Sequence, residues 1–180
     1  MPFVSVDIQA IPVIHSENVS TLISDSGNVY QLDADIWQVY PNEGDQYSFF
    51  PEKIHVQIFD SLLHVVADIV ADTAYYFEKR ELWHTIENVV VKNDEGTIFE
   101  TSELFWDTKV PPNVMNAFYT YKPVKISKSD GTVVYGHRGF TADQSLRITR
   151  LFSVGADLYI TESDDTIQHD VTGSDSIRLP

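Results

Sequence analysis

Residues 64–107 read HVVADIVADTAYYFEKRELWHTIENVVVKNDEGTIFETSELFWD, and their pattern decides the fold. Valine, isoleucine and aromatic residues come in short runs. Charged or turn-forming residues separate the runs at positions 78–81 and 93–96. β-Branched and aromatic runs between Asn, Asp and Gly turns are typical of antiparallel hairpins. The stretch therefore predicts three strands joined by two turns.

Residues 62–76 also fit the spacing of an amphipathic helix, because Leu62, Val65 and Val66 recur at i, i+3 and i+4. The surrounding valines and aromatic residues lose rotamer freedom in a helix and pack well on a pleated surface. We therefore favour strands, with the helix as the alternative.

The composition limits the classes of function. The chain has 180 residues, no cysteine and a net charge of −15. This length suits one domain with a core of its own. The negative charge disfavours nucleic acid as a partner. The chain lacks the apolar run of about 18 residues that a membrane-spanning helix needs, and its beginning lacks the pattern of an export signal.

The same pattern of strands and turns extends along the chain. We expect a leader or linker at residues 1–20, a β-domain at 21–160 and an acidic, disordered tail at 161–180. The predicted architecture is an all-β open roll of up-and-down strands. Turns are expected at similar intervals, near Asp60, Lys79, Asp94, Lys109, Asp130 and Ser145.

No motif for catalysis, a metal or a cofactor is present. His55 and His64 flank one predicted turn, and a cross-strand polar pair explains them better than half of a metal site. Asp33 and Asp35 share one strand face, as paired catalytic carboxylates do. The chain has 27 acidic residues, so chance explains that pair better. We predict no enzyme, no metal and no cofactor.

Two further features have two interpretations each. Basic residues gather between positions 122 and 150, where they either protect strand edges or face an anionic ligand. Apolar residues lie on both faces of several strands: Ile54 and Val56 face one way and Phe59 the other. These residues form either a two-layer core with some exposed aromatics or an interior for an apolar ligand. Each buried methylene of an acyl chain gains ~0.8 kcal/mol.

Several segments together resemble one family. They read TLISDSG, FDSLLHVVADIVADTAYYF, ELWHTIENVVVKN, TIFETSELFWD and VVYGHRGFTADQSL. Their order and spacing over residues 21–160 are similar to the Bacteroidetes-type LptC family of lipopolysaccharide-export proteins. The resemblance implies a twisted, open antiparallel β-jellyroll, as in the OstA, LptA and LptC proteins. It also implies that Asn88 lies at a strand bend.

The resemblance further implies a lipid relay without enzymatic activity or cofactor. Such a protein accepts lipopolysaccharide from an inner-membrane ABC transporter and passes it to an LptA-like bridge protein. It is periplasmic and tethered to the inner membrane, here through an N-terminal segment that this chain lacks. The alternative function is a non-enzymatic β-sandwich module of the cell envelope for assembly or glycan binding. An enzyme that uses Asp33 and Asp35 is disfavoured.

The relay function implies two sets of site residues. Inward-facing residues would contact lipid, although a slip of one residue in strand register inverts the two faces. The lipid-contact candidates are Trp37, Phe50, Ile54, Val56, Phe59, Val65, Ala67, Tyr75, Val89, Val91, Phe105 and Phe140. The candidates for the edge that pairs with the bridge protein are Gly136, Phe140 and Ala142.

Overall fold

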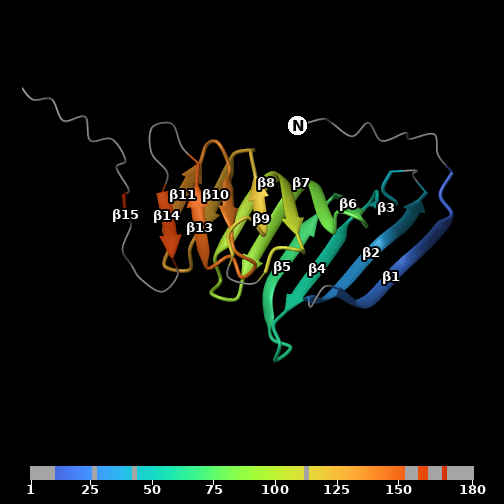
Figure 1. The fold of residues 1–180 in the computed structure, drawn as a ribbon. Coiled ribbons are helices and arrows are strands. Elements are labelled where there is room, and N and C mark those ends of the chain that lie inside the picture. The colour runs from blue at the N-terminus through green and yellow to red at the C-terminus, as the bar shows by residue number, and fades with distance from the viewer. Residues whose placement is uncertain are drawn as a thin grey trace, which may run out of the picture.

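The computed structural model describes residues 11–25, 28–41, 44–111, 114–152, 158–161 and 168–169. All regular structure in this part of the chain is β-strand, and every strand pair is antiparallel (Figure 1). The predicted all-β antiparallel class is therefore confirmed. Within the same residues, there is no helix of the length and apolarity needed to cross a membrane.

The strands are short in the C-terminal third and long elsewhere. They are β1 (Ile14–Asp25), β2 (Asn28–Tyr40), β3 (Tyr47–Phe50), β4 (Ile54–Phe59), β5 (Val65–Ala71), β6 (Thr73–Phe77), β7 (Leu82–Asn93), β8 (Ile98–Asp107), β9 (Phe118–Thr120), β10 (Val124–Ser127), β11 (Val133–Gly136), β12 (Phe140–Ala142), β13 (Ile148–Leu151), β14 (Leu158–Thr161) and β15 (Gln168–His169).

Several of these strands are halves of one longer strand. Both β3 and β4 pair with β2, and residues 51–53 between them interrupt the pairing. Pro51 lies in this interruption, where a residue without an N–H group is tolerated. In the same way β5 pairs with β4 and β6 with β3, and only Asp72 separates the two halves. From β3 to β12 the chain is thus a meander of long strands that are broken near their middles.

The breaks lie side by side on neighbouring strands. The register between β7 and β8 shifts between Ile86 and Val89, and the residues between have positive φ angles of 63° at Glu87 and 47° at Asn88. The side chain of Asn88 donates a hydrogen bond of 2.6 Å to Asp72, which is the break of the neighbouring strand. The bend expected at Asn88 is therefore confirmed. A bulge bends its strand, so a row of bulges creases the whole sheet.

This crease divides the sheet into two layers. Layer A contains β4, β5, β10 and β11, with the half of β7 that follows the break and the half of β8 that precedes it. Layer B contains β3, β6, β9, β12 and β13, with the other halves of β7 and β8. The two long strands β1 and β2 run through both layers at one end of the molecule (Figure 1).

The core lies between the two layers. Ile54, Val56 and Ile58 of layer A are each at most 2% exposed. The ring of Tyr30, on the layer A half of β2, lies 6.0 Å from Trp83 and 5.3 Å from Trp106 of layer B, measured between centroids. Alternate residues of both layers thus pack against each other, as in a two-layer β-structure.

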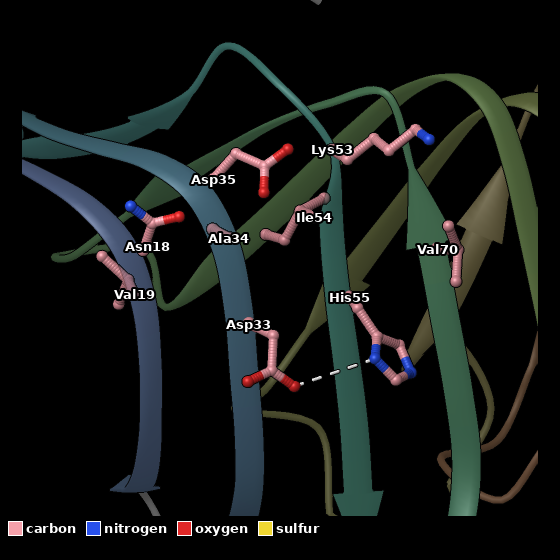
Figure 2. A pocket seen from close by; sticks show the side chains of 9 residues that line it. All are labelled: Asn18, Val19, Asp33, Ala34, Asp35, Lys53, Ile54, His55 and Val70. Carbon is pink, nitrogen blue, oxygen red and sulfur yellow. Dashed lines mark ion pairs between the residues drawn. The ribbon is translucent and has the colours of Figure 1, made fainter.

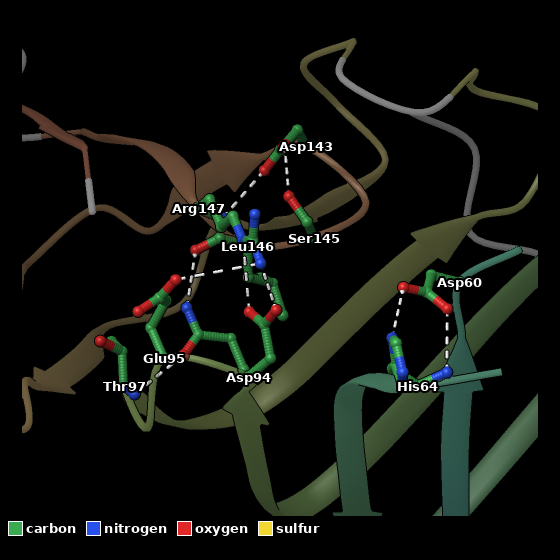
Figure 3. A network of polar contacts seen from close by, with 10 residues as sticks. Asp60, His64, Asp94, Glu95, Thr97, Asp143, Ser145, Leu146 and Arg147 are labelled. Atoms are coloured by element: carbon green, nitrogen blue, oxygen red, sulfur yellow. Dashed lines mark hydrogen bonds and ion pairs between the residues drawn. The ribbon is translucent and has the colours of Figure 1, made fainter. Parts of the chain in front are cut away.

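The free margins of the layers are formed by hairpin turns, and we call them the lips. Layer A turns at residues 60–64, 93–97 and 128–132, and layer B turns at residues 78–81, between β8 and β9, and at residues 143–147. Among the described residues, the contacts that join the lips are made by side chains. Asn28 donates to the carbonyl oxygen of Thr108 at 3.0 Å, and Asn93 donates to that of Leu146 at 3.3 Å. Arg147 pairs with Asp94 (Figure 3).

The predicted strands and turns agree closely with the structure. All six predicted turns are present, and residues 62–76 are strands with a turn, which excludes the helix alternative. One boundary is wrong: β1 begins at Ile14, inside the segment expected to be a leader. That strand is held in place by its pairing with β2. This pairing leaves no pattern in the sequence of residues 14–20 themselves. Residues 1–10 of the leader, and residues 162–167 and 170–180 of the predicted tail, lie outside the described residues. Within the segment expected to be disordered, Gln168 and His169 form β15, which pairs with β14.

Candidate functional site

A cavity of about 290 Å³ lies between the two layers at the β1 end of the molecule. Its walls come from β1, β2, β3, β6 and β7, together with the turn after β6, and they are mostly apolar. Glu78 is its one charged lining residue. The lining residues are Ile23, Ser24, Tyr30, Leu32, Trp37, Ser48, Phe50, Tyr76, Glu78 and Trp83.

An inner row of aromatic rings leads from this cavity into the core. Trp37 stacks on Phe50 with centroids 6.2 Å apart, and Phe50 stacks on Trp83 at 5.5 Å. The row continues to Trp106 at 6.4 Å and to Phe118 at 5.7 Å, with near-parallel ring planes. The rings occupy inward positions on β2, β3, β7, β8 and β9. Strand pairing aligns the rings on β2 and β3 and those on β7, β8 and β9, whereas β6 lies between the strands of Phe50 and Trp83.

Beyond the cavity, side chains fill the interior. A void of about 10 Å³ separates Val56 and Ile69 of layer A from Trp83 and Trp106 of layer B. A single water needs roughly 10–15 Å³, so the void has no room for an acyl chain. In this state the space between the layers is a packed core with a cavity at one end, and not a continuous trough.

The structure places eight of the twelve lipid-contact candidates toward the interior, and two of them, Trp37 and Phe50, line the cavity. The sequence analysis missed the other eight lining residues, among them Tyr30, Leu32 and Trp83; for the first two, the alternation of Tyr30, Leu32 and Ala34 on one strand was the available signal. The interior candidates are Trp37, Phe50, Ile54, Val56, Ala67, Val89, Val91 and Phe140.

The other four candidates do not lie in the interior, which corrects the prediction. Val65 is 38% exposed at the start of β5. Phe59 follows the buried Ile58, at a shift in register between β4 and β5. Tyr75 and Phe105 lie on the outer face of layer B, because their neighbours in sequence face the core. The sequence showed the alternation in each strand, but not which face was inward.

Two of the three edge candidates are also wrong. Phe140 and Ala142 belong to β12, which pairs with β9 on one side and β13 on the other. A strand with two neighbours has no free backbone groups to offer. Gly136 ends β11, which pairs with β10 alone among the described strands. At the other end of the molecule β1 pairs with β2 alone.

Asp33, Asp35 and His55 line a second cleft, of about 280 Å³, on the outer side of the crease (Figure 2). The side chains of Asp33 and His55 already have partners within the protein. Asp33 accepts a hydrogen bond of 2.6 Å from Ser20, and His55 lies 3.0 Å from Asp68. With the ion pair of 3.8 Å between His55 and Asp33, these contacts form a polar network across four strands, β1, β2, β4 and β5. The structure groups no three potential metal ligands among the described residues.

The outer face of layer B has its own row of rings. Phe49 stacks on Tyr75 at 4.7 Å, His84 on Phe105 at 4.2 Å, and Phe105 on Tyr119 at 5.1 Å. These distances match the spacing of ~4.8 Å between strands, so the rings stand upright and cover each other's faces. Burial in this row lowers the pKa of His84, although its hydrogen bond to Glu103 opposes the shift.

The basic residues of positions 122–150 lie away from the cavity, and none of them lines it. Lys125 pairs with Glu100 across neighbouring strands at 2.7 Å. Arg147 pairs with Asp94 and lies 3.9 Å from Glu95 at the lips. Two of these cations thus have acidic partners within the protein.

Two comparisons with known proteins found nothing similar to this chain. A scan against protein-family models finds no match to the chain, and a search of curated proteins finds none either.

Proposed function

We propose that this chain is a lipopolysaccharide-binding relay protein without enzymatic activity, and that its folded sheet is an open antiparallel jellyroll of the LptC kind. It would act in the periplasm, accept lipid from an inner-membrane ABC transporter and pass it to an LptA-like bridge protein. The sequence resemblance over residues 21–160 supports this proposal, as does the all-β fold.

The observation that carries the proposal is the apolar cavity between the layers. Its volume of about 290 Å³ lies at the lower end of the ~300–1,000 Å³ of small-molecule sites. Its walls combine aliphatic and aromatic side chains with few polar groups. Each methylene that leaves water for such walls gains ~0.8 kcal/mol, so an acyl chain binds there without a specific polar contact.

Longer acyl chains require the layers to move apart, because the interior beyond the cavity is full. The crease is made of continuous backbone and resists separation. The lips are joined by side chains such as Asn28, Asn93 and Arg147. The least costly opening is therefore at the lips, and a lipid that binds the open state better would shift the population toward it.

Among the described strands, β1, β11 and β15 have a single partner, and β15 has only two residues. The other two suit a relay: eleven residues of β1 pair with β2 alone, and at the far end β11 pairs with β10 alone. An unpaired edge can add a strand from another protein. We assign β1 and β11 as the edges that pair with the transporter and the bridge protein.

Native mass spectrometry of the purified chain tests the proposal. We expect complexes with lipopolysaccharide and with its isolated lipid A, since the acyl chains supply the binding energy. The matched control is the polysaccharide released from the same lipopolysaccharide, which we expect not to bind. Binding of the polysaccharide but not of lipid A would contradict the relay and favour the glycan-binding module.

A further inference from the structure

The hairpin between β4 and β5 ends in two exposed leucines. Leu62 is 73% exposed and Leu63 is 65% exposed. Figure 1 shows this hairpin extending farther from the body of the sheet than the neighbouring turns. Leu63 also has a φ of 64°, a left-handed conformation that glycine and asparagine adopt far more readily than leucine. Solvation and backbone conformation both disfavour leucine here, so the stability of the turn does not explain these residues.

The apolar surface continues from the leucines onto the outer face of layer A. Val65 is 38% exposed and pairs with Phe59, which in turn pairs with Val29 of β2. Phe59 and Val29 are half-buried and alternate with buried neighbours, so they face outward. We call Val29, Phe59, Leu62, Leu63 and Val65 the tip patch. Contiguous exposed apolar residues of this kind mark sites that contact a membrane or another protein.

The turn supplies hydrogen-bond partners for its own backbone. One carboxylate oxygen of Asp60 accepts from the N–H groups of Leu62 and His64, each at 2.8 Å. The N–H of Leu63 donates to the carbonyl oxygen of Asp60 at 3.0 Å. The His64 ring lies 3.3 Å from the other carboxylate oxygen (Figure 3). Polar groups that enter an apolar layer need internal partners, and these N–H groups have them before the tip leaves water.

We propose that this tip docks on a membrane surface of neutral phospholipid, with Leu62 and Leu63 entering the acyl layer. A specific protein interface uses ~20–30 residues on each side, whereas the tip patch has five on a protruding hairpin. Hydrogen bonds from the backbone lower the pKa of Asp60, so its carboxylate is charged at neutral pH. This charge and the net charge of −15 repel anionic lipids and restrict the insertion to the leucines.

The inference goes beyond the proposed relay, because it concerns the membrane and not the cargo. The tip belongs to the lip of layer A, at residues 60–64. Docking would therefore bring the opening between the layers to the lipid surface, and acyl chains would enter the protein there.

Flotation with vesicles of dioleoylphosphatidylcholine tests the inference on the full chain. We expect the wild-type protein to float with the vesicles. Leu62→Asn and Leu63→Asn should each lower the partition coefficient about tenfold, the effect of one leucine side chain that leaves water. Ile11→Asn is the matched control, because isoleucine and leucine are isomers and Ile11, before β1, is 84% exposed. This variant should float as the wild-type protein does.

Unfolding would not account for the loss of binding. Asparagine adopts a positive φ more readily than leucine, so urea unfolding of Leu63→Asn should show a stability equal to or above that of the wild type. Absence of the wild-type protein from the vesicles, or equal flotation of the wild type and Leu62→Asn/Leu63→Asn, would overturn the inference. Lipopolysaccharide binding in native mass spectrometry would then still support the relay. Binding that requires phosphatidylglycerol in the vesicles would also contradict docking on a neutral surface.

Discussion

A short cross-link between the lips is expected to abolish the loading of long-chain lipid. Asp94 and Arg147 form an ion pair between the two lips, and the chain has no cysteine. In the variant D94C/R147C a bis-methanethiosulfonate reagent would join the layers. Since the interior beyond the cavity is full, acyl chains longer than the cavity can enter only when the layers separate. Lipopolysaccharide binding by native mass spectrometry should therefore disappear and return when the cross-link is reduced.

The matched control joins two residues of the same layer. Glu100 and Lys125 form an ion pair of 2.7 Å between β8 and β10. The same reagent in E100C/K125C leaves the lips free, so lipid should load normally. Unchanged loading by the cross-linked D94C/R147C protein would show that lipid reaches the protein without separation of the lips.

Replacing Gly139 by alanine is expected to have the largest effect on stability. Gly139 has a φ of 94°, and a Cβ atom there would lie 1.9 Å from the carbonyl oxygen of Thr120. The clash is with backbone on the neighbouring strand and cannot be relieved by a side-chain rotation. Strain and overpacking each cost roughly 1–3 kcal/mol. Urea unfolding should show a loss of about 3–5 kcal/mol, from a total stability of typically ~5–15 kcal/mol.

Gly131 supplies the control for this variant. Its φ of 91° is similar, but a Cβ atom there would meet nothing within 4 Å. Gly131→Ala therefore measures the conformational strain alone, of about 1–2 kcal/mol. Equal losses in the two variants would show that the close approach of Gly139 to Thr120 is not maintained in solution.

The strands and turns of this fold could be predicted from the sequence because their signals are local. Val89, Val90 and Val91 alternate between core and surface as expected, and the turn at residues 93–97 lies where Asn, Asp and Gly predict it. The side chain of Asn93 accepts a hydrogen bond of 2.8 Å from the N–H of Thr97. Such contacts lie within a few residues and leave a clear pattern in the sequence.

The crease and the candidate site could be predicted only in part, because they depend on contacts between distant strands. The break at Asp72 is recognisable only once Asn88 of the neighbouring strand is seen beside it. The outward placement of Tyr75 and Phe105 follows from which face the second layer covers. The cavity is lined by both Ile23 of β1 and Trp83 of β7. These residues are far apart in the sequence, so no sequence pattern predicts that they lie together.

Photo-cross-linking at two adjacent phenylalanines tests most directly whether acyl chains bind between the layers. Phe50 lines the cavity and is 1% exposed, whereas Phe49 lies on the outer face of layer B and stacks on Tyr75. Benzoylphenylalanine would replace each in turn, in the presence of lipopolysaccharide. We predict a lipid adduct from position 50 and none from position 49. Equal adducts from both positions, or an adduct from position 49 alone, would contradict a binding site between the layers.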